Sequence, residues 1–320
     1  MCKIGMNMKS LSRYILVVLI LGITTICSAQ DQVVYNNYVS NQGILNPAYN
    51  GTRDNISGLL IMRKQWFGFD GAPFTGALNV HSPIDAVDNL GLGLVVQNDH
   101  IGFTNNLEIF AAGSYRLKIN RDLTLSLGLQ MGVKNVIYDG TKAVIVDYGD
   151  PVFDGRISKF GFNFGTGAYL YTNSYFVGFS VPGFFANKYD TDKQEIKNVV
   201  RFKDVHSYIY GGYVFDVDDI LIKPTGLVRV VPGAPLTIDI SCSFRPIKDY
   251  DLWVGLSYRT VSELVFMAEY RINRKWTIKY SFDYSISDIQ SYAKAGSHEI
   301  GVQFDFSPKR RPGMRSMRYF

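Results

Sequence analysis

The sequence predicts an all-β protein: a transmembrane antiparallel β-barrel of the outer-membrane type, with about 14 strands and a lower count of about 12. Three observations predict this fold. Apolar and polar residues alternate along many segments, several segments are long enough to cross a bilayer, and the connections between them sort by length. After residue 30, no apolar run reaches the roughly 18 residues of a membrane-spanning helix. A helical membrane protein is therefore excluded, and the 47% hydrophobic content excludes intrinsic disorder.

Residues 1–29 predict a secretory signal peptide, with a positive start, an apolar stretch and a small-residue cleavage site. The alternatives are an uncleaved anchor, for which the apolar stretch is short, and a lipoprotein modified at Cys27. The bulky Ile26 before that cysteine disfavours the lipoprotein. Cleavage makes Gln30 the first mature residue. The signals are Lys3, Lys9 and Arg13, then Ile15–Ile23, then Cys27-Ser28-Ala29.

The charge of the mature chain gives no sign of nucleic-acid binding. The leader holds three basic and no acidic residues, so the formal charge falls from +5 to about +2. The mature chain keeps one cysteine, Cys242, and so does not depend on disulfides. Residues 307–320 form a basic tail, which we interpret as solvated. Its basic residues are Lys309, Arg310, Arg311, Arg315 and Arg318.

Residues 30–56 precede the first predicted strand and are expected to lie in the periplasm or in the barrel lumen. The stretch from Asn46 to Gly51 combines proline with Asn-Gly turn chemistry. It is either a plug or docking segment, or a piece of chain that simply packs against the barrel wall. Under the first alternative, Asn46, Pro47 and Tyr49 are candidate partner-binding residues.

The barrel is predicted over residues 57–306. In residues 122–134, Leu, Met and Val alternate with Thr, Ser, Gly, Gln and Lys, which places one set on each face of a strand. Several segments approach the roughly 9–11 residues that a membrane strand needs. The predicted strands are 57–68, 74–82, 89–98, 105–119, 122–135, 158–172, 174–181, 205–216, 219–231, 235–245, 250–259, 262–272, 275–285 and 297–306.

The connections give a second test. If the first strand runs outward, every second connection is periplasmic and short, and the long stretches 136–157 and 182–204 fall on the outer side. The alternating polar set faces the lumen and carries charges of both signs, which predicts a network of ion pairs. A soluble β-sandwich would have to bury these charges, at several kcal/mol each if unpaired. The set is Arg116, Lys118, Lys134, Lys223, Arg229, Asp239, Arg245, Arg259, Glu269, Arg271, Lys279, Asp283, Glu299 and Asp305.

Aromatic residues outside the strands are further candidates for partner contacts. Trp66, Phe69 and Asp70 lie in a predicted tight outer hairpin, and Phe184 and Phe185 lie in a long outer loop. Aromatic side chains on exposed loops fit a protein contact. The two loop phenylalanines could equally fold inward and fill the lumen.

No pattern in the sequence predicts catalysis. The four histidines lack metal-ligand spacing, and neighbouring Ser297, His298 and Glu299 would alternate between the two faces of a strand. Inward-facing glycines, rather than phosphate loops, account for the Gly91 and Gly161–Gly167 stretches. We therefore predict no catalytic, cofactor or metal site.

Several motifs together resemble the PorP/SprF family of the type IX secretion system. The resemblance covers nearly the whole mature chain and rests on the order and spacing of the motifs. The tail after the last strand is a departure, so Phe306 rather than Phe320 is expected to act as the assembly-signal residue. The motifs are Asn46–Gly51, Arg63–Pro73, His81-Ser82-Pro83, Asp99–Gly102, Gly178–Pro182 and Gly296–Ile300.

The resemblance implies a non-enzymatic barrel in the bacterial outer membrane that contacts lipid. Its implied partners are the type IX machinery, including a periplasmic ring and a peptidoglycan-binding component, and exported cargo such as adhesins used in gliding. Two alternatives remain open at this point: an outer-membrane channel for small solutes, and a purely structural barrel.

Overall fold

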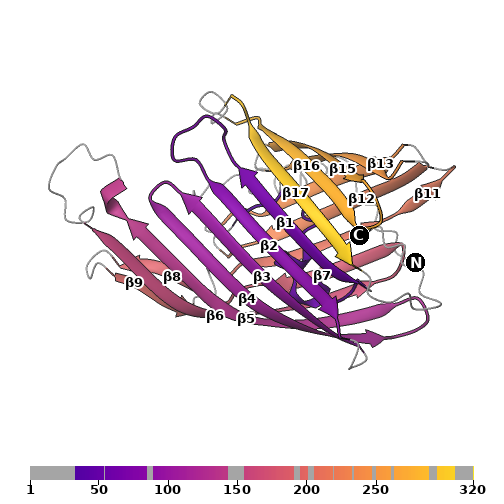
Figure 1. Ribbon diagram of the computed structural model, residues 1–320, viewed down its shortest axis with the longest axis horizontal. Helices are drawn as coiled ribbons and strands as arrows, with labels where there is room; N and C mark the ends of the chain where they lie inside the picture. Colours follow the sequence, from indigo (N-terminus) through magenta and orange to yellow (C-terminus); the bar gives the residue numbers. More distant parts are fainter. Residues whose placement is uncertain are drawn as a thin grey trace, which may run out of the picture.

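The computed structural model is a closed ring of antiparallel strands (Figure 1). It describes residues 33–53, 55–84, 89–142, 155–190, 195–200, 205–218, 220–232, 234–246, 250–260, 263–287, 294–306 and 320. The predicted signal peptide and all of the tail except Phe320 lie outside these residues. Among the described residues, no helix is long and apolar enough to span a membrane.

The elements follow in chain order. Two short helices come first: α2 (Gln42–Leu45) and η1 (Pro47–Tyr49). A third helical turn, η2 (Gly140–Lys142), lies between two strands. The strands are β1 (Ile56–Lys64), β2 (Phe74–Pro83), β3 (Leu90–Ile101), β4 (Thr104–Lys118), β5 (Thr124–Asp139), β6 (Arg156–Tyr171), β7 (Tyr175–Val181), β8 (Phe185–Asp190), β9 (Glu195–Val200), β10 (Ser207–Tyr213), β11 (Phe215–Val217), β12 (Ile220–Val230), β13 (Thr237–Arg245), β14 (Leu252–Arg259), β15 (Glu263–Arg271), β16 (Trp276–Ser285) and β17 (Ser297–Phe306).

Strand pairing closes the sheet. β1 pairs with β17, and β10 pairs with both β7 and β12. β10 and β11 keep one register against β12, with Gly212 opposite Thr225 and Phe215 opposite Ile222, so together they form one barrel strand. The result is the predicted closed barrel of 14 strands. Closure leaves no free edge, which a sheet in lipid requires because the bilayer offers the backbone no hydrogen-bond partner.

The barrel is apolar outside and polar inside, as the alternation predicted. On β1, Leu60 and Met62 are 43% and 51% exposed, whereas Arg63 is fully buried. On β16, Thr277, Lys279, Ser281 and Asp283 are buried between exposed apolar neighbours. The outward set therefore forms the lipid-facing surface, and the inward set lines the lumen.

The connections sort by length as expected. At one end, which we call the short-turn end, the strands are joined by short segments such as 119–123, 172–174 and 272–275. At the other, the long-loop end, lie residues 65–73, and the strands that border the connections 140–155 and 182–206 end there. The turns at 120 and 273 share one chemistry. Asn120 Oδ1 accepts from the backbone of Asp122 and Leu123, and Asn273 Oδ1 accepts in the same way from Lys275 and Trp276.

The structure differs from the prediction in two of the outer connections. β1 ends at Lys64 instead of residue 68, because the chain takes positive φ values at Trp66, Gly68 and Gly71 that a strand cannot accommodate. The connection to β2 is therefore nine residues long (65–73) and not a tight hairpin. The stretch 182–204, predicted as a loop, contains the hairpin β8–β9, which projects beside β6 in Figure 1.

Candidate functional site: a chain segment inside the barrel

Residues 33–53, the lumen segment, lie inside the barrel, and most of them are buried. The segment runs down the inner wall. The backbone of Asn36 donates to Glu299, near the long-loop end of β17, and Arg53 contacts Asp305, near the short-turn end of the same strand. Six strand residues separate these two contacts, about 20 Å along the wall. The segment therefore occupies the lumen along much of its length.

The local sequence explains how the lumen segment turns. Asn46 caps η1, because its side-chain oxygen accepts from the Ala48 backbone N–H at 2.9 Å. Pro47 follows at the first helical position, where a missing N–H costs nothing. Gly51 then takes a φ of 76°, which redirects the chain toward β1. The Asn46–Gly51 motif thus builds a compact turn.

This turn lies directly on the wall at two inward-facing glycines. A Cβ at Gly128 of β5 would come within 2.2 Å of the Ala48 nitrogen. A Cβ at Gly167 of β6 would come within 2.0 Å of Asn46 Oδ1. Any larger residue would collide with the segment, so these glycines permit the contact.

Polar contacts attach the same turn to the wall. Asn46 Nδ2 donates to the backbone carbonyls of Ala168 (3.0 Å) and Phe179 (3.2 Å). Asn79 Nδ2 donates to Asn50 Oδ1 at 3.1 Å, and the backbone N–H of Gly51 donates to His81 Nδ1 at 3.2 Å. Because these groups are buried, the bonds satisfy donors and acceptors that would otherwise be costly to bury.

Apolar contacts complete the attachment on two sides. Tyr35 and Ile44 pack against inward-facing Leu59, Ile61 and Phe110. Tyr49 packs edge-on against Tyr169, with ring centroids 5.5 Å apart, inside a larger aromatic cluster. The remaining members of that cluster are Tyr38, Val39, Leu45, Ala48, Tyr171, Phe176, Tyr208, Tyr210, Val214, Leu221, Leu227, Trp253 and Phe320.

A buried charge cluster meets the upper part of the lumen segment. Arg63 lies 2.7 Å from Asp283 Oδ2 and 3.6 Å from Glu299 Oε2. The backbone N–H groups of Asn36 and Asn37 donate to the two oxygens of Glu299, and Asn36 Nδ2 donates to Asp283 at 2.7 Å. One arginine and two carboxylates leave an excess negative charge, which these three donors stabilise.

Other inward charges are paired, as predicted for the lumen set. Arg259 pairs with Asp239 (2.8 Å) and with Glu263, and Lys134 pairs with Glu108 at 2.9 Å. Further pairs join Lys279 to Glu269 (3.3 Å) and Arg53 to Asp305 (3.3 Å). The last two involve the lumen segment, because Ser40 also donates to Glu269. These two pairs therefore help to hold the lumen segment in place.

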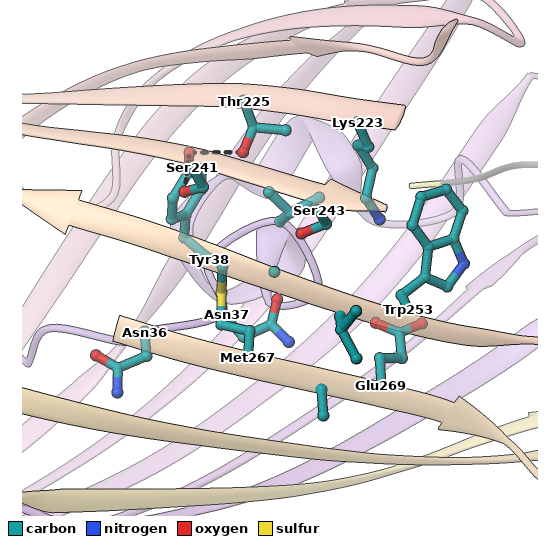
Figure 2. Close-up of a pocket in the computed structure, with 14 residues that line it drawn as sticks. Asn36, Asn37, Tyr38, Lys223, Thr225, Ser241, Ser243, Trp253, Met267 and Glu269 are labelled. Carbon is teal, nitrogen blue, oxygen red and sulfur yellow. Dashed lines mark hydrogen bonds between the residues drawn. The ribbon is translucent and has the colours of Figure 1, made fainter. Parts of the chain in front are cut away.

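Tyr38 ties the middle of the segment to β12. Its hydroxyl donates to Thr225 Oγ1 at 3.0 Å and lies 3.4 Å from Ser241 Oγ (Figure 2).

The sequence matches the family described as type IX secretion system membrane protein PorP/SprF over residues 27–304. The chain belongs to the PorP/SprF family. This membership and the closed barrel place the protein in the bacterial outer membrane. The comparison with curated proteins gives no match.

Solved structures resemble this PorP/SprF chain only in outline. The Acinetobacter baumannii outer membrane protein Omp33 is 11% identical, with a TM-score of 0.45, and the match covers 80% of this chain and 99% of that one. The CymD monoaromatic hydrocarbon channel is also 11% identical, with a TM-score of 0.45 and coverage of 83% and 91%. Such a likeness carries no argument about function, and the barrel assignment rests on the strand pairing itself.

The structure places the candidate partner-binding residues of this PorP/SprF protein in separate regions. Asn46, Pro47 and Tyr49 lie together, buried in the lumen. At the long-loop end, Trp66 is half-buried, whereas Phe69 and Asp70 are exposed in the connection between β1 and β2.

Phe184 and Phe185 do not fill the lumen. They pack against Phe164, with ring centroids 4.8 and 5.4 Å away, and Phe164 belongs to the outward set of β6. Of the two alternatives for these residues, inward folding is therefore wrong.

Sequence reasoning missed most of the residues that contact the lumen segment. It placed Arg63 in a family motif and Asp283 and Glu299 in the lumen set, without linking them to residues 36 and 37. One available signal was the density of asparagine at positions 36, 37, 41, 46 and 50. In an apolar chain, amides at this density indicate buried polar contacts, since each needs hydrogen-bond partners.

Proposed function

We propose that this PorP/SprF protein is a plugged outer-membrane component that helps particular cargo proteins leave the cell through the type IX system. Family membership supports the link to type IX secretion. In this proposal the short-turn end faces the periplasm and meets the machinery, including a periplasmic ring and a peptidoglycan-binding component. The long-loop end faces outward and meets cargo, such as large adhesins used in gliding.

The observation that carries this proposal is the occupied lumen. Residues 33–53 are bonded to the wall by Asn36, Tyr38, Asn46 and Asn50. A solute channel needs a continuous aqueous path, and a protein that works through contacts does not. The occupied lumen therefore favours a binding role over the transport of small solutes.

The outer contact surface is proposed to include Trp66, Phe69, Asp70, Phe184 and Phe185. Phe69 is 47% exposed and lies at the long-loop end with an exposed carboxylate beside it. Aromatic side chains are enriched in protein interfaces relative to the rest of the surface. The lumenal Asn46, Pro47 and Tyr49 are proposed to act indirectly, by holding the plug.

The first test is the surface and secreted proteome of a clean deletion strain, compared with its parent and a complemented strain. Loss of one or a few large surface proteins, with other type IX cargo unchanged, is the expected result. Loss of all type IX cargo would replace cargo specificity with a core role in the machine. An unchanged proteome would overturn the secretion role.

The second test separates the contact surface from the fold. Complementation with Phe69→Ser combined with Asp70→Asn is expected to leave barrel levels normal and to reduce surface cargo. The matched control is Ile101→Ser, because Ile101 is apolar, 43% exposed and at the same end of the barrel, but lies outside the proposed contact surface. Equal cargo loss in both strains would contradict an outer contact surface.

The third test concerns the rival channel function. The purified barrel in a planar bilayer is expected to pass no steady current, because the lumen segment blocks the path. A steady conductance that scales with salt would overturn the plugged state and favour a solute channel.

A further inference from the structure

The outward face of the barrel changes character at the long-loop end of three strands. On β17 the outward row begins at Phe306 and ends at His298, and on β1 it begins at Ile56 and ends at Lys64. On β3 the outward row ends at His100. Each of these apolar rows therefore ends in a side chain that can carry positive charge or donate a hydrogen bond. We call His298, Lys64 and His100 the outer basic cluster.

The outer basic cluster lies at the height of a membrane interface. Phe306 and His298 lie eight positions apart on β17, which is about 26 Å along a strand. With a strand tilt of about 40°, this distance is about 20 Å along the barrel axis, close to the apolar band of about 25 Å that crosses an outer membrane. Tyr280 and Tyr284 on neighbouring β16 also face outward near this level. The lipid phosphates of the leaflet at this end therefore lie close to the cluster.

Strand register makes neighbours of the side chains in the outer basic cluster. His298 is the cross-strand partner of Lys64, Lys64 is the partner of Phe74, and Phe74 is the partner of His100. Directly paired residues have Cβ atoms about 4.5–5.5 Å apart. One phosphate group can therefore contact Lys64 and His298 together, with His100 on the far side of the Phe74 ring.

Contacts with neighbouring residues hold His298 and Lys64 in place. His298 Nδ1 lies 2.8 Å from the Tyr280 hydroxyl, and Phe67 packs edge-on against the imidazole, with ring centroids 5.7 Å apart. When the Tyr280 hydroxyl donates to Nδ1, the proton of the neutral ring lies on Nε2, which becomes a donor. Lys64 Nζ donates to the Ala72 carbonyl at 2.9 Å and keeps two further N–H donors. The pair therefore offers at least three donors to a ligand.

The charge of the outer basic cluster is not neutralised by the strands that carry it. Among the described residues, no ion pair joins the cluster to a carboxylate. Asp99 and Glu299 on β3 and β17 are buried on the opposite, lumenal face, and Asp70 is exposed in the connection between β1 and β2. An anionic group that reaches the cluster from the bilayer would thus find donors without a competing carboxylate on the same face of these strands.

The cluster is confined to one side of the barrel. On β12–β16, the described outward rows end at the long-loop side in apolar or tyrosine side chains. These residues are Val230, Ile238, Tyr258, Leu264 and Tyr284. Residues that only mark the membrane interface would be spread around the whole rim. Their grouping on β17, β1 and β3 therefore favours a specific ligand.

We propose that the outer basic cluster binds the phosphate group of a membrane lipid. Lys64 and the Nε2–H of His298 donate to the phosphate oxygens, and the acyl chains lie along the apolar rows of β17 and β1. A bound lipid would steady the connection between β1 and β2, because Phe67 and Ala72 contact the same two side chains. The site depends on the barrel and not on the secretion role, so lipid binding by the purified protein tests it separately from the proteome experiment.

Native mass spectrometry of the purified barrel in detergent measures how many lipids are bound at each lipid concentration. The probes are phosphatidic acid and diacylglycerol with the same acyl chains, which differ only in the phosphate group. We expect phosphatidic acid to bind about tenfold more tightly than diacylglycerol. Equal affinity for the two lipids would overturn the proposal.

Three variants locate the site. Lys64→Gln combined with His298→Gln should weaken the binding of phosphatidic acid about tenfold, and Tyr280→Phe, which removes the hydroxyl that orients the imidazole, about threefold. Arg156→Gln is the matched control, because Arg156 is an exposed cation at the same end of the barrel but lies on β6 opposite Asp139. Its affinity should be unchanged. An equal loss in the control and in the double variant would show general attraction between cations and anionic lipid, and would overturn the site.

Folding and the source of the phosphate are checked in parallel. Each variant is tested for heat-modifiable gel mobility, and the single Lys64→Gln remains informative if the double variant does not fold. Inorganic phosphate at the same concentration is expected not to displace phosphatidic acid. Displacement would reassign the site to free phosphate and overturn the lipid.

Discussion

On β3–β6 the lumen segment lies directly on the backbone of the wall, whereas along β12–β16 side chains and cavities separate the two. On the first side, Gly128 and Gly167 let the Asn46–Gly51 turn approach the strands to contact distance. On the second side, two cavities separate residues 36–40 from strands β12–β16. The first side therefore fixes the segment, and the second leaves space beside it.

This difference in packing indicates where substitutions should reduce stability most. Close backbone packing and buried charge tolerate little change, because a clash or an unpaired charge finds no relief. In a hydrated, charged cavity, water and side-chain movement can compensate for a substitution. We expect the loss in free energy of unfolding to decrease from the buried charge cluster, through the glycine contact and the η1 cap, to the rim of the cavity. The free energy is measured by urea titration of tryptophan fluorescence in detergent.

The largest loss is expected for Arg63→Met. It leaves Asp283 and Glu299 buried without their cation, which should cost about 3–5 kcal/mol. The control is the triple variant with Asp283→Asn and Glu299→Gln, which removes the charges together and should recover most of the loss. A loss below about 1 kcal/mol for the single variant would show that the cluster is open to water.

A smaller loss is expected for Gly128→Ala, which brings a methyl group into the Ala48 backbone. Overpacking of this kind costs about 1–3 kcal/mol. Gly113→Ala on β4 is matched in chemistry, and its Cβ would meet nothing within 4 Å. If the two variants unfold at the same urea concentration, the segment does not lie on the wall as described.

Asn46→Ala should cost about 1–2 kcal/mol, because it removes the η1 cap and two bonds to wall carbonyls. Asn46→Asp keeps the cap but loses the donor to Ala168 and Phe179, so it separates the two contributions. Recovery of full stability by Asp would assign the whole effect to the cap.

The smallest effect belongs to the cavity side. Arg271→Gln breaks a largely exposed pair with Asp251 and should change stability by less than about 0.5 kcal/mol. A loss of stability similar to that of Arg63→Met would contradict the proposed difference in packing between the two sides of the lumen segment.

The sequence predicted the barrel well because the patterns that specify strands and turns are local. Period-2 alternation in 122–134 or in β16 reports which face each residue occupies, and charged residues on the polar face predicted a polar interior. Asn120 and Asn273 predicted two tight turns by the same local logic. The predicted end of β1 beyond Trp66 was wrong. The positive φ at this tryptophan depends on tertiary contacts, such as the hydrogen bond from its backbone N–H to the Ser297 side chain.

By itself, then, the sequence determined the strand count, the face of each residue and the family motifs. Only the tertiary structure decided that residues 33–53 occupy the lumen, since their partners on the wall are 29 to more than 260 positions away. Nothing in a local pattern links Asn36 to Glu299 or Gly167 to Asn46. Such contacts depend on closure of the ring, which brings distant strands around one segment and leaves cavities on the side that packs less closely.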